Sequence, residues 1–536
     1  MKKSLLWVVV LLISIMTVFS FSGCKPTAVT ESAEETAAAT SEATVEETAA
    51  LEGEIVTEGL EYSLPEYPTK QEKEAILAAR KIAEEMGGEV TLKLLISPDN
   101  VSDFEPFYPE WERETGIKLE TYTVPWPDWF KELMNVSITK TDKYDVFMDC
   151  PQWIPDLAEA KVLENLDPFV EKYKPEIADP NSPNTVLPGL ESFMKYQDSY
   201  YMFFSDTDVA TLYLRKDLLE DTDNKTAFES KYGYPLDKPK TLDEWKDQLE
   251  FFNRPDEGLY GMAMSWGSDE TAFDFYPRLL SQKVAFFDDE MHPNINSPEA
   301  VKALQEMKDN LPYAMPGTME FDFARALEAF ANGQTYCTLI MTWAQAAFED
   351  PKISKVVGKV TYAPYPGRMI DGELVNPQPQ YWGWGYSVSA NSKNKELAYL
   401  YCQWMSGAAM NARVALTPGG WYDVNKASNY DEAQFPEIQR KNGGMYMTEW
   451  MDNQKWQVQH CFPAISLRGG AEYSGVLLEA VSGVLKGAQE PKAALDNVAA
   501  KWEEITERYG REAQIESWNS AKNMYSPAVR AWLGFE

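Results

Sequence analysis

The pattern of apolar positions between residues 89 and 150 predicts alternating strands and helices. Apolar residues alternate in EVTLKLLIS (89–97), which is typical of a strand. The segment PFYPEWERETGIKLETYTV then predicts a helix that ends at Gly116, followed by a second strand. A third apolar run, KYDVFMDC (143–150), is followed by Pro151. This strand–helix–strand spacing predicts parallel βαβ units and therefore an α/β fold.

The later part of the chain continues this rhythm with helices that have recognisable ends. TLDEWKDQLEFF begins with Thr241 and has Glu244 three residues later, which is the pattern of a capping box. SPEAVKALQEMKDN and NKELAYLYCQWMSG begin in a similar way, and the second should end at Gly407. Ligands of parallel sheets bind at the carboxyl ends of the strands, and Asp149 lies at one such end.

The beginning of the chain has the pattern of an export signal. Lys2 and Lys3 precede fifteen nearly unbroken apolar residues, 5–19. A helix that spans a membrane needs about 20 residues, so this run favours a cleaved signal peptide, residues 1–23. An uncleaved anchor helix is the alternative.

Cys24 follows the signal directly. The tetrapeptide Phe21-Ser22-Gly23-Cys24 resembles the lipobox of bacterial lipoproteins, although Phe21 stands where leucine is usual. This resemblance implies that the Cys24 thiol is lipidated. Two or three acyl chains would hold the mature protein at the outer side of the cytoplasmic membrane, and this lipid anchor would be its only attachment to the membrane.

An acidic segment separates this cysteine from the rest of the chain. Residues 31–58 contain nine Glu, no Lys or Arg and no aromatic residue. Such a composition cannot bury enough apolar surface to offset chain entropy, so we expect a disordered spacer over residues 24–60. About 30 disordered residues span roughly 30 Å, which lets a folded body stand off the membrane.

The net charge and the small numbers of histidines and cysteines argue against several classes of function. The net charge is −35, and most of it lies outside the spacer, so phosphate-rich nucleic acid is an unfavourable partner. Only two histidines are present, which argues against histidine catalysis and histidine-rich metal sites. The four cysteines beyond the signal (Cys150, Cys337, Cys402 and Cys461) lack metal-ligand spacing, and we expect most to be buried free thiols.

Motifs of catalysis and of metal binding do not fit this chain. DTDNKTAFESKY opens like a calcium-binding loop but has Thr226 in place of the required glycine and Tyr232 in place of the required glutamate. G-x-S-x-G, H-E-x-x-H and P-loop sequences do not occur. We therefore expect no catalytic residue, no metal and no cofactor. A glycosidase pair of carboxylates stays open, because acidic residues are abundant.

Five segments occur in a distinctive order along the chain: LYLRKDLLED, PKTLDEWKDQ, AFANGQTYCTLIMTW, YWGWGYSVSANSKNKELAYLYCQWM and LKGAQEPKAALDNVAAKW. Together they resemble the sugar-binding branch of the extracellular solute-binding proteins of ABC transporters, family 1, which includes maltose-binding protein. Leu242 stands where the family usually has tryptophan, and Thr335-Tyr336-Cys337 departs from the family pattern.

This resemblance implies a periplasmic-binding-protein-like fold with two α/β lobes. Each lobe would hold a mainly parallel sheet flanked by helices, and a multi-strand hinge would join the two. The expected boundaries are 88–205 plus 368–425 for lobe 1 and 206–367 plus 426–536 for lobe 2. The ligand would bind in the cleft between the lobes.

Aromatic rings and carboxylates are the groups that bind sugars, because rings cover apolar C–H faces and carboxylates accept from hydroxyls. Trp343 matches the family's ligand-stacking tryptophan, and Asp206 and Asp208 stand at the first expected crossing between lobes. The full set of candidates is Trp126, Asp149, Asp206, Asp208, Trp266, Trp343, Trp382, Trp384 and Trp421. The alternative for the tryptophans is a place in the core, and for the acids a helix cap or a solvated loop.

The sequence thus predicts a lipid-anchored, extracytoplasmic protein, in the periplasm or at the cell surface, that captures a mono- or oligosaccharide. It would act as a monomer, deliver the sugar to an ABC transporter permease and catalyse no reaction. One alternative is an exported glycoside hydrolase or lyase that uses paired carboxylates. Another is a sugar receptor for a membrane sensor kinase.

Overall fold

The computed structural model describes residues 67–267, 270–380, 383–417, 420–431 and 448–535, which belong to one compact unit of the chain. The predicted signal peptide, Cys24, the spacer and Trp382 lie outside the described residues. Within the described ranges, no helix is both long and apolar enough to cross a membrane.

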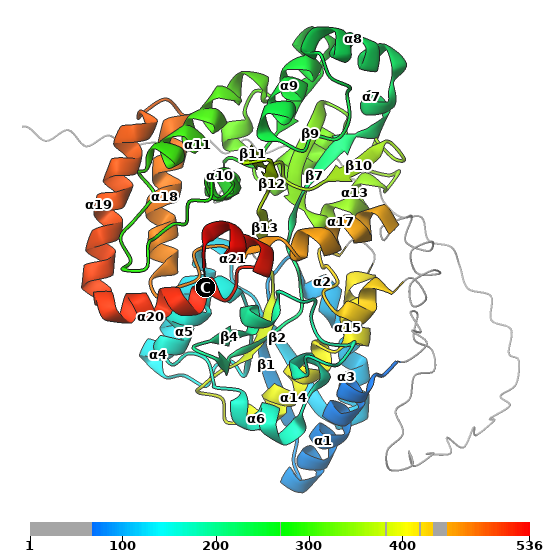
Figure 1. Ribbon diagram of the computed structural model, residues 1–536. Helices are drawn as coiled ribbons and strands as arrows, with labels where there is room; N and C mark the ends of the chain where they lie inside the picture. The colour runs from blue at the N-terminus through cyan, green and yellow to red at the C-terminus, as the bar shows by residue number, and fades with distance from the viewer. Residues whose placement is uncertain (1–66, 268–269, 381–382, 418–419, 432–447, 536) are drawn as a thin grey trace, which may run out of the picture. The chain divides into compact units, whose positions relative to one another are not determined.

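Two separate sheets organise the described chain (Figure 1). The first has the order β2-β1-β3-β14-β6, with β1 Val90–Leu95, β2 Ile117–Tyr122, β3 Val146–Asp149, β6 Met202–Phe204 and β14 Gly385–Val388. The second has the order β10-β7-β9-β8, with β7 Ala210–Arg215, β8 Tyr260–Ala263, β9 Thr335–Met341 and β10 Val360–Ala363. We call the part built on the first sheet lobe 1 and the part built on the second lobe 2.

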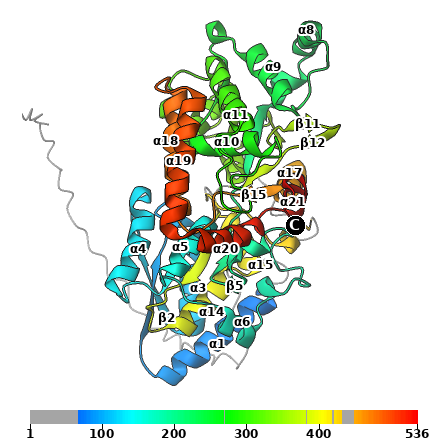
Figure 2. The same ribbon diagram turned by 60° about the vertical axis from the view of Figure 1, so that its left-hand side comes forward.

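Helices cover both sheets. Those of lobe 1 are α1 Lys70–Met86, α2 Val101–Phe104, α3 Tyr108–Thr115, α4 Trp129–Thr139, α5 Ile154–Glu159, α6 Asp167–Tyr173, α14 Lys395–Met405 and α15 Ala408–Ala415. Those of lobe 2 are α7 Lys216–Glu220, α8 Thr222–Tyr232, α9 Leu242–Phe252, α10 Glu270–Leu280, α11 Pro298–Asp309, α12 Phe323–Ala331, α13 Gln345–Phe348, α17 Thr448–Val458, α18 Gly470–Leu485, α19 Pro491–Tyr509, α20 Arg511–Lys522 and α21 Pro527–Leu533. Figures 1 and 2 show α18 and α19 side by side.

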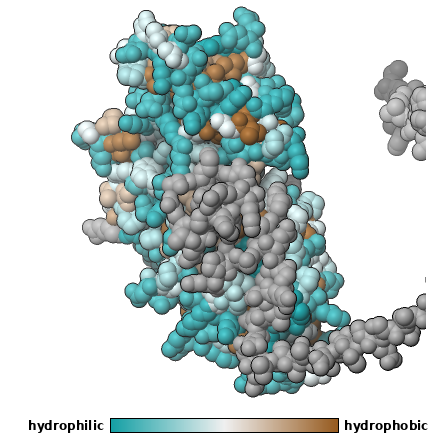
Figure 3. Space-filling model, turned by 90° about the vertical axis from the view of Figure 1, so that its right-hand side faces the viewer, coloured by the Kyte–Doolittle hydropathy of each residue, from teal (hydrophilic) through white to brown (hydrophobic). Residues whose placement is uncertain are grey.

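Three short strand pairs complete the described strands. They are β4 Lys195–Tyr196 with β5 Ser199–Tyr200, β11 Arg368–Ile370 with β12 Glu373–Val375, and β13 Gln378–Gln380 with β15 Cys461–Pro463. On the face shown in Figure 3 the visible coloured surface is mostly hydrophilic, with small and separate hydrophobic areas. This surface agrees with the high net charge of the chain.

The predicted βαβ pattern is confirmed. β1 pairs in parallel with β2 and with β3, and the intervening α3 has Gly116 as its left-handed C-cap. The predicted capping box is also present, because the Glu244 N–H donates to Thr241 Oγ1 at 3.2 Å and the Thr241 N–H donates to Glu244 Oε2 at 3.1 Å. The segment that only opens like a calcium loop is α8. The four cysteines are buried, as expected.

One strand in each sheet runs against the others. β14 is antiparallel to β3 and β6, and β7 is antiparallel to β9 and β10. Each reversed strand follows a passage of the chain from one sheet to the other: residues 205–209 lead from β6 to β7, and the described residues 364–380 and 383–384 lie between β10 and β14. A third passage leads from α15 to α17 and carries Asp423. The lobe boundaries expected from the sequence stay a prediction.

Each lobe has its own hydrophobic core. Helix α1 packs against lobe 1, and helix α15 contributes residues to both cores. α1 precedes the expected start of lobe 1 and packs on α14, where the Gln71 side chain donates to the Gln403 carbonyl at 2.7 Å. α15 contributes Met410 and Val414 to the core of lobe 1 and Ala412 to the core of lobe 2. α15 therefore anchors the third passage to both lobes.

A buried ion pair fixes α15 on α3. The guanidinium of Arg413, 2% exposed, donates to both carboxylate oxygens of Glu110, at 2.8 and 3.2 Å, and stacks over the rings of Tyr67 and Phe107. Two charges removed from water offset each other only as a pair, so the loss of one partner leaves an uncompensated charge.

We predict that Arg413→Met lowers the free energy of unfolding by about 3–5 kcal/mol, because Glu110 then remains buried without a counter-charge. The double variant Glu110→Leu/Arg413→Met should recover most of this loss. Urea unfolding of the three proteins measures both effects. Equal losses in the single and double variants would contradict this account.

Candidate functional site

A cavity of about 350 Å³ lies where the chain passes between the two sheets. Both lobes contribute to its wall. The lining residues are Ser97, Asp99, Asn100, Trp126, Asp208, Glu270, Asp322, Phe323, Ala324, Met341, Trp343, Trp384 and Trp421. Several of them lie at the carboxyl ends of strands: residues 97–100 come after β1, and Met341 is the last residue of β9. The carboxyl ends of strands are where α/β sheets bind ligands.

Trp343 and Trp421 form one aromatic wall of this cavity. Their rings are stacked, with centroids 4.7 Å apart and planes 7° apart. Trp343 is 7% exposed, whereas Trp421 is 39% exposed. The Trp421 N–H donates to Asp103 Oδ2 at 3.3 Å. The inner ring is thus buried, and the outer ring is available to a ligand.

Trp384 and Trp126 form the wall that comes from lobe 1. Their rings meet edge to face with centroids 5.7 Å apart. Strand β14 begins at Gly385, so Trp384 precedes the strand. Gly383 has φ 75°, and a Cβ there would lie 2.5 Å from the Phe204 ring. Only glycine fits this turn, and the turn sets the position of Trp384.

Three aspartates meet beneath the tryptophans. One carboxylate oxygen from each of Asp206, Asp208 and Asp423 lies within 4.8 Å of the others, close enough to share a cation. Backbone N–H groups bind two of them: Gly383 donates to Asp208 at 3.2 Å, and Asp423 donates to Asp206 at 2.7 Å. The Thr342 hydroxyl donates to Asp423 at 2.5 Å.

The second oxygens of these three carboxyl groups have no hydrogen-bond partner in the described protein. Burial raises the pKa of Asp208 to about 7. It raises the pKa of Asp206 well above the usual value, and the negative charges of Asp208 and Asp423 add to that rise. The pKa of Asp423 is raised by burial and by Asp208. The cluster therefore favours bound protons or a bound cation near neutral pH.

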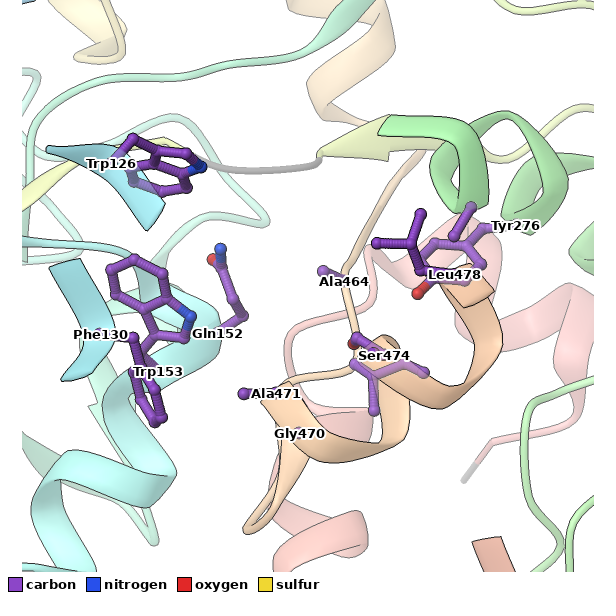
Figure 4. A pocket seen from close by; sticks show the side chains of 13 residues that line it. Trp126, Phe130, Gln152, Trp153, Tyr276, Ala464, Gly470, Ala471, Ser474 and Leu478 are labelled. Atoms are coloured by element: carbon purple, nitrogen blue, oxygen red, sulfur yellow. The ribbon is translucent and has the colours of Figure 1, made fainter. Parts of the chain in front are cut away.

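A second cavity, of about 260 Å³, adjoins the first, because Trp126 lines both (Figure 4). In Figure 4, Trp126, Phe130, Gln152 and Trp153 of lobe 1 face Tyr276, Ala464, Ser474 and Leu478 of lobe 2. Ala272, Ile465, Gly470, Ala471 and Gly475 complete its wall. None of the described residues that line it has a charged side chain.

The structure brings five of the predicted residues together in the first cavity: Trp126, Asp208, Trp343, Trp384 and Trp421. Asp206 is fully buried behind Asp208. Asp149 is fully buried in lobe 1, where the Ser387 hydroxyl donates to it at 2.9 Å, and Trp266 packs in the core of lobe 2. These three do not line the cavity, and Trp382 lies outside the described residues. All nine stay predictions as ligand-binding residues.

Sequence reasoning missed five polar residues of the lining, Ser97, Asp99, Asn100, Glu270 and Asp322. Asp99 and Asn100 follow the first predicted strand, so the same strand-end rule that selected Asp149 could have found them. Asp322 is the N-cap of α12, where its Oδ1 accepts from the Arg325 N–H at 2.9 Å. Asp322 and Glu270 enter the site through the packing of lobe 2, and no local sequence signal marks them.

Two α/β lobes, linked by passages of the chain and enclosing an aromatic cavity between them, define a two-lobe ligand-binding protein. The model of the bacterial extracellular solute-binding protein family matches residues 98–412, more than half of the chain. The chain belongs to this family. Its members are binding proteins, and the family places the protein outside the cytoplasm.

Known proteins show the same likeness. The chain is 23% identical over 285 residues to the maltotriose-binding protein of Pyrococcus abyssi, and the match covers 52% of this chain and 54% of that protein. It therefore spans about half the length of this curated relative.

Two solved structures support the fold. The maltose-bound MalE3 protein of T. maritima is 20% identical, with a TM-score of 0.63 over 78% of this chain and 100% of that one. A solute-binding protein from Agrobacterium radiobacter K84, in complex with ribitol, is 22% identical with a TM-score of 0.61 over 78% and 98%. At these identities the likeness confirms the predicted two-lobe fold.

We predict that Asp208→Asn changes how the stability of the ligand-free protein depends on pH. The folded pKa of about 7 lies above the ordinary value of 3.8, so protonation of Asp208 stabilises the fold fully below pH 3.8, and this stabilisation is lost as the pH rises to 7. The asparagine variant lacks this slope. Its melting temperature should be lower than that of the wild type at pH 4, and the difference should shrink or reverse by pH 8.

Asp309→Asn, on the exposed end of α11, is the matched control and should keep the wild-type slope. A difference between Asp208→Asn and the wild type that does not vary between pH 4 and pH 8 would contradict the assignment.

Proposed function

We propose that this protein captures a carbohydrate in the cavity between its lobes and delivers it to an ABC transporter permease. The observation that carries this proposal is the composition of the cavity, in which four tryptophans stand together with two buried carboxylates, Asp208 and Glu270. Tryptophan rings cover the apolar faces of sugars, and a carboxylate accepts from their hydroxyls. The similar proteins of known structure support it, since their ligands are maltose and ribitol.

The aromatic walls can supply the affinity that such a receptor needs. Complete burial of one ring removes about 150–250 Å², worth roughly 4–6 kcal/mol as an upper limit. The entropy of association and the desolvation of hydroxyls consume much of this gain. Because both lobes line the cavity, a ligand that contacts both walls favours the closed arrangement and shifts the equilibrium towards it.

The N-terminal residues supply the proposed location. Lipidation of Cys24 would anchor the protein to the outer side of the membrane, and the acidic spacer would leave the lobes free to meet the permease. The protein would act there as a monomer.

One observation favours a second function. The pKa of Asp208 is raised to about 7, as a general acid of a glycoside hydrolase requires, and Glu270 lines the same cavity. Release of chromophore from a panel of nitrophenyl glycosides would identify an enzyme. We expect none, because the family is one of binding proteins.

We predict that Trp343→Ala weakens carbohydrate binding about 30- to 1,000-fold, as loss of a buried aromatic anchor does, and also lowers the melting temperature, because Trp343 is 7% exposed and packs in the core of lobe 2. A thermal-shift screen of mono- and oligosaccharides identifies the ligand first, and calorimetry then measures the affinity. Trp266→Ala is the comparison, because Trp266 packs in the same core without lining the cavity: its truncation should cost about 3–5 kcal/mol of stability and leave the affinity of the folded protein unchanged. Unchanged affinity in Trp343→Ala would remove this ring from the site.

We also predict that Cys24→Ala releases the protein from the membrane fraction. The reason is that the thiol of Cys24 is the proposed point of lipid attachment. Fractionation of cells that express each form, followed by immunoblotting, measures the distribution. If the variant remains in the membrane fraction and is cleaved like the wild type, the anchor lies elsewhere.

A further inference from the structure

The first cavity is acidic and has no cationic side chain among the residues that the structure describes. Its lining includes four carboxylates, Asp99, Asp208, Glu270 and Asp322, and its side-chain donors are neutral: the Ser97 hydroxyl, the Asn100 amide and the tryptophan N–H groups. Among its other polar groups, the Asn100 amide already donates to Asp103 Oδ2 at 3.0 Å. A neutral sugar hydroxyl needs acceptors and donors alike, whereas a protonated amine offers three donors and no acceptor. The acidic lining therefore favours an ammonium group over a neutral hydroxyl.

Asp208 is the acid best placed to receive such a group. It is only 5% exposed, it lines the cavity, and its Oδ1 has no hydrogen-bond partner. Its Oδ2 accepts from the Gly383 N–H at 3.2 Å. A buried carboxylate oxygen without a partner costs free energy in the empty site, and a charged donor from a ligand removes that cost.

No cationic side chain of the described protein neutralises the aspartate cluster to which Asp208 belongs. Asp206, Asp208 and Asp423 form no ion pair in the described ranges. The buried Lys426, close to Asp423 in the chain, donates to the Phe204 carbonyl at 2.9 Å and to Asn425 Oδ1 at 2.6 Å. A cationic ligand would therefore supply the counter-charge that these carboxyl groups need in order to ionise.

The carboxylates that line the first cavity are not simply a consequence of the acidic surface of the protein. The second cavity shares Trp126 with the first, yet no charged side chain lines it, as Figure 4 shows for its labelled residues. Charge is thus concentrated on one side of Trp126. The tryptophan rings of the first cavity add to the preference for a cation, because the face of an indole ring attracts positive charge.

We propose that the ligand is an amine-bearing carbohydrate, an amino sugar or a short amino-sugar oligomer, whose ammonium group binds Asp208 between the tryptophan walls. This inference rests on the proposed function, since it specifies the chemical class of the captured carbohydrate. The same geometry disfavours uronates and phosphorylated sugars, because their anions would meet four carboxylates.

The test compares three disaccharides that share one skeleton and differ in one group. The probes are the β-1,4-linked dimer of glucosamine, the same dimer with both amines acetylated, and cellobiose. Calorimetry on the purified full-length protein measures each affinity at neutral pH. We expect the free amine to bind at least ten-fold more tightly than the other two. Asp208→Asn should remove most of this preference, and Asp309→Asn, on the exposed end of α11, should retain it.

Each outcome decides the inference. If cellobiose or the acetylated dimer binds as tightly as the amine, the inference is overturned and the proposed function stands. If no carbohydrate of a broad screen binds, both are overturned. If calcium or magnesium chloride alone stabilises the protein and the glucosamine dimer does not bind, the acids hold a metal ion and the inference is overturned. A free-amine preference in the wild type supports it even if Asp208→Asn does not fold.

Discussion

The aspartate cluster between the lobes is the interaction on which the rest of the structure depends. Asp206 and Asp208 belong to the first passage between the sheets, Gly383 to the second and Asp423 to the third. The Gly383 N–H binds Asp208 and the Asp423 N–H binds Asp206, so all three passages are joined by hydrogen bonds to carboxylates. The Thr342 hydroxyl donates to Asp423, so the turn after β9 belongs to the same network of hydrogen bonds. The two lobes are thus connected at one buried polar junction.

The same junction places the aromatic walls. Each of the tryptophans next to the cluster lies one or two residues from a member of its hydrogen-bond network: Trp343 follows Thr342, Trp384 follows Gly383, and Trp421 stands two residues before Asp423. A shift of any passage would therefore move a ring of the binding cavity. In a protein whose lobes close around a ligand, this arrangement links the contacts of the ligand directly to the segments between the lobes.

Periodicity and helix capping were enough to predict the α/β class, the parallel β1–β3 units and the capping box at Thr241, because local hydrophobic pattern determines these elements. Five of the nine candidate residues line the cavity, because strand ends and crossing segments are visible in the sequence. Trp266 and Asp149 could not be distinguished from these five residues. A residue of the core and a residue of the cavity wall have the same local sequence signal. Glu270 depends on the packing of lobe 2 and has no such signal.

Three buried carboxyl groups without a counter-charge break the usual rule that buried polar groups are satisfied, and such exceptions concentrate at functional sites. Hydrophobic residues of similar size would join the passages without this cost, so stability alone does not account for the acids. Asp208, unlike Asp206 and Asp423, reaches the cavity, and through it a ligand can act on the charge of the whole cluster. A bound cationic group would stabilise the ionised carboxylates and, with them, the hydrogen bonds that join the three passages. Ligand capture and the connection between the lobes would then depend on the same carboxylates.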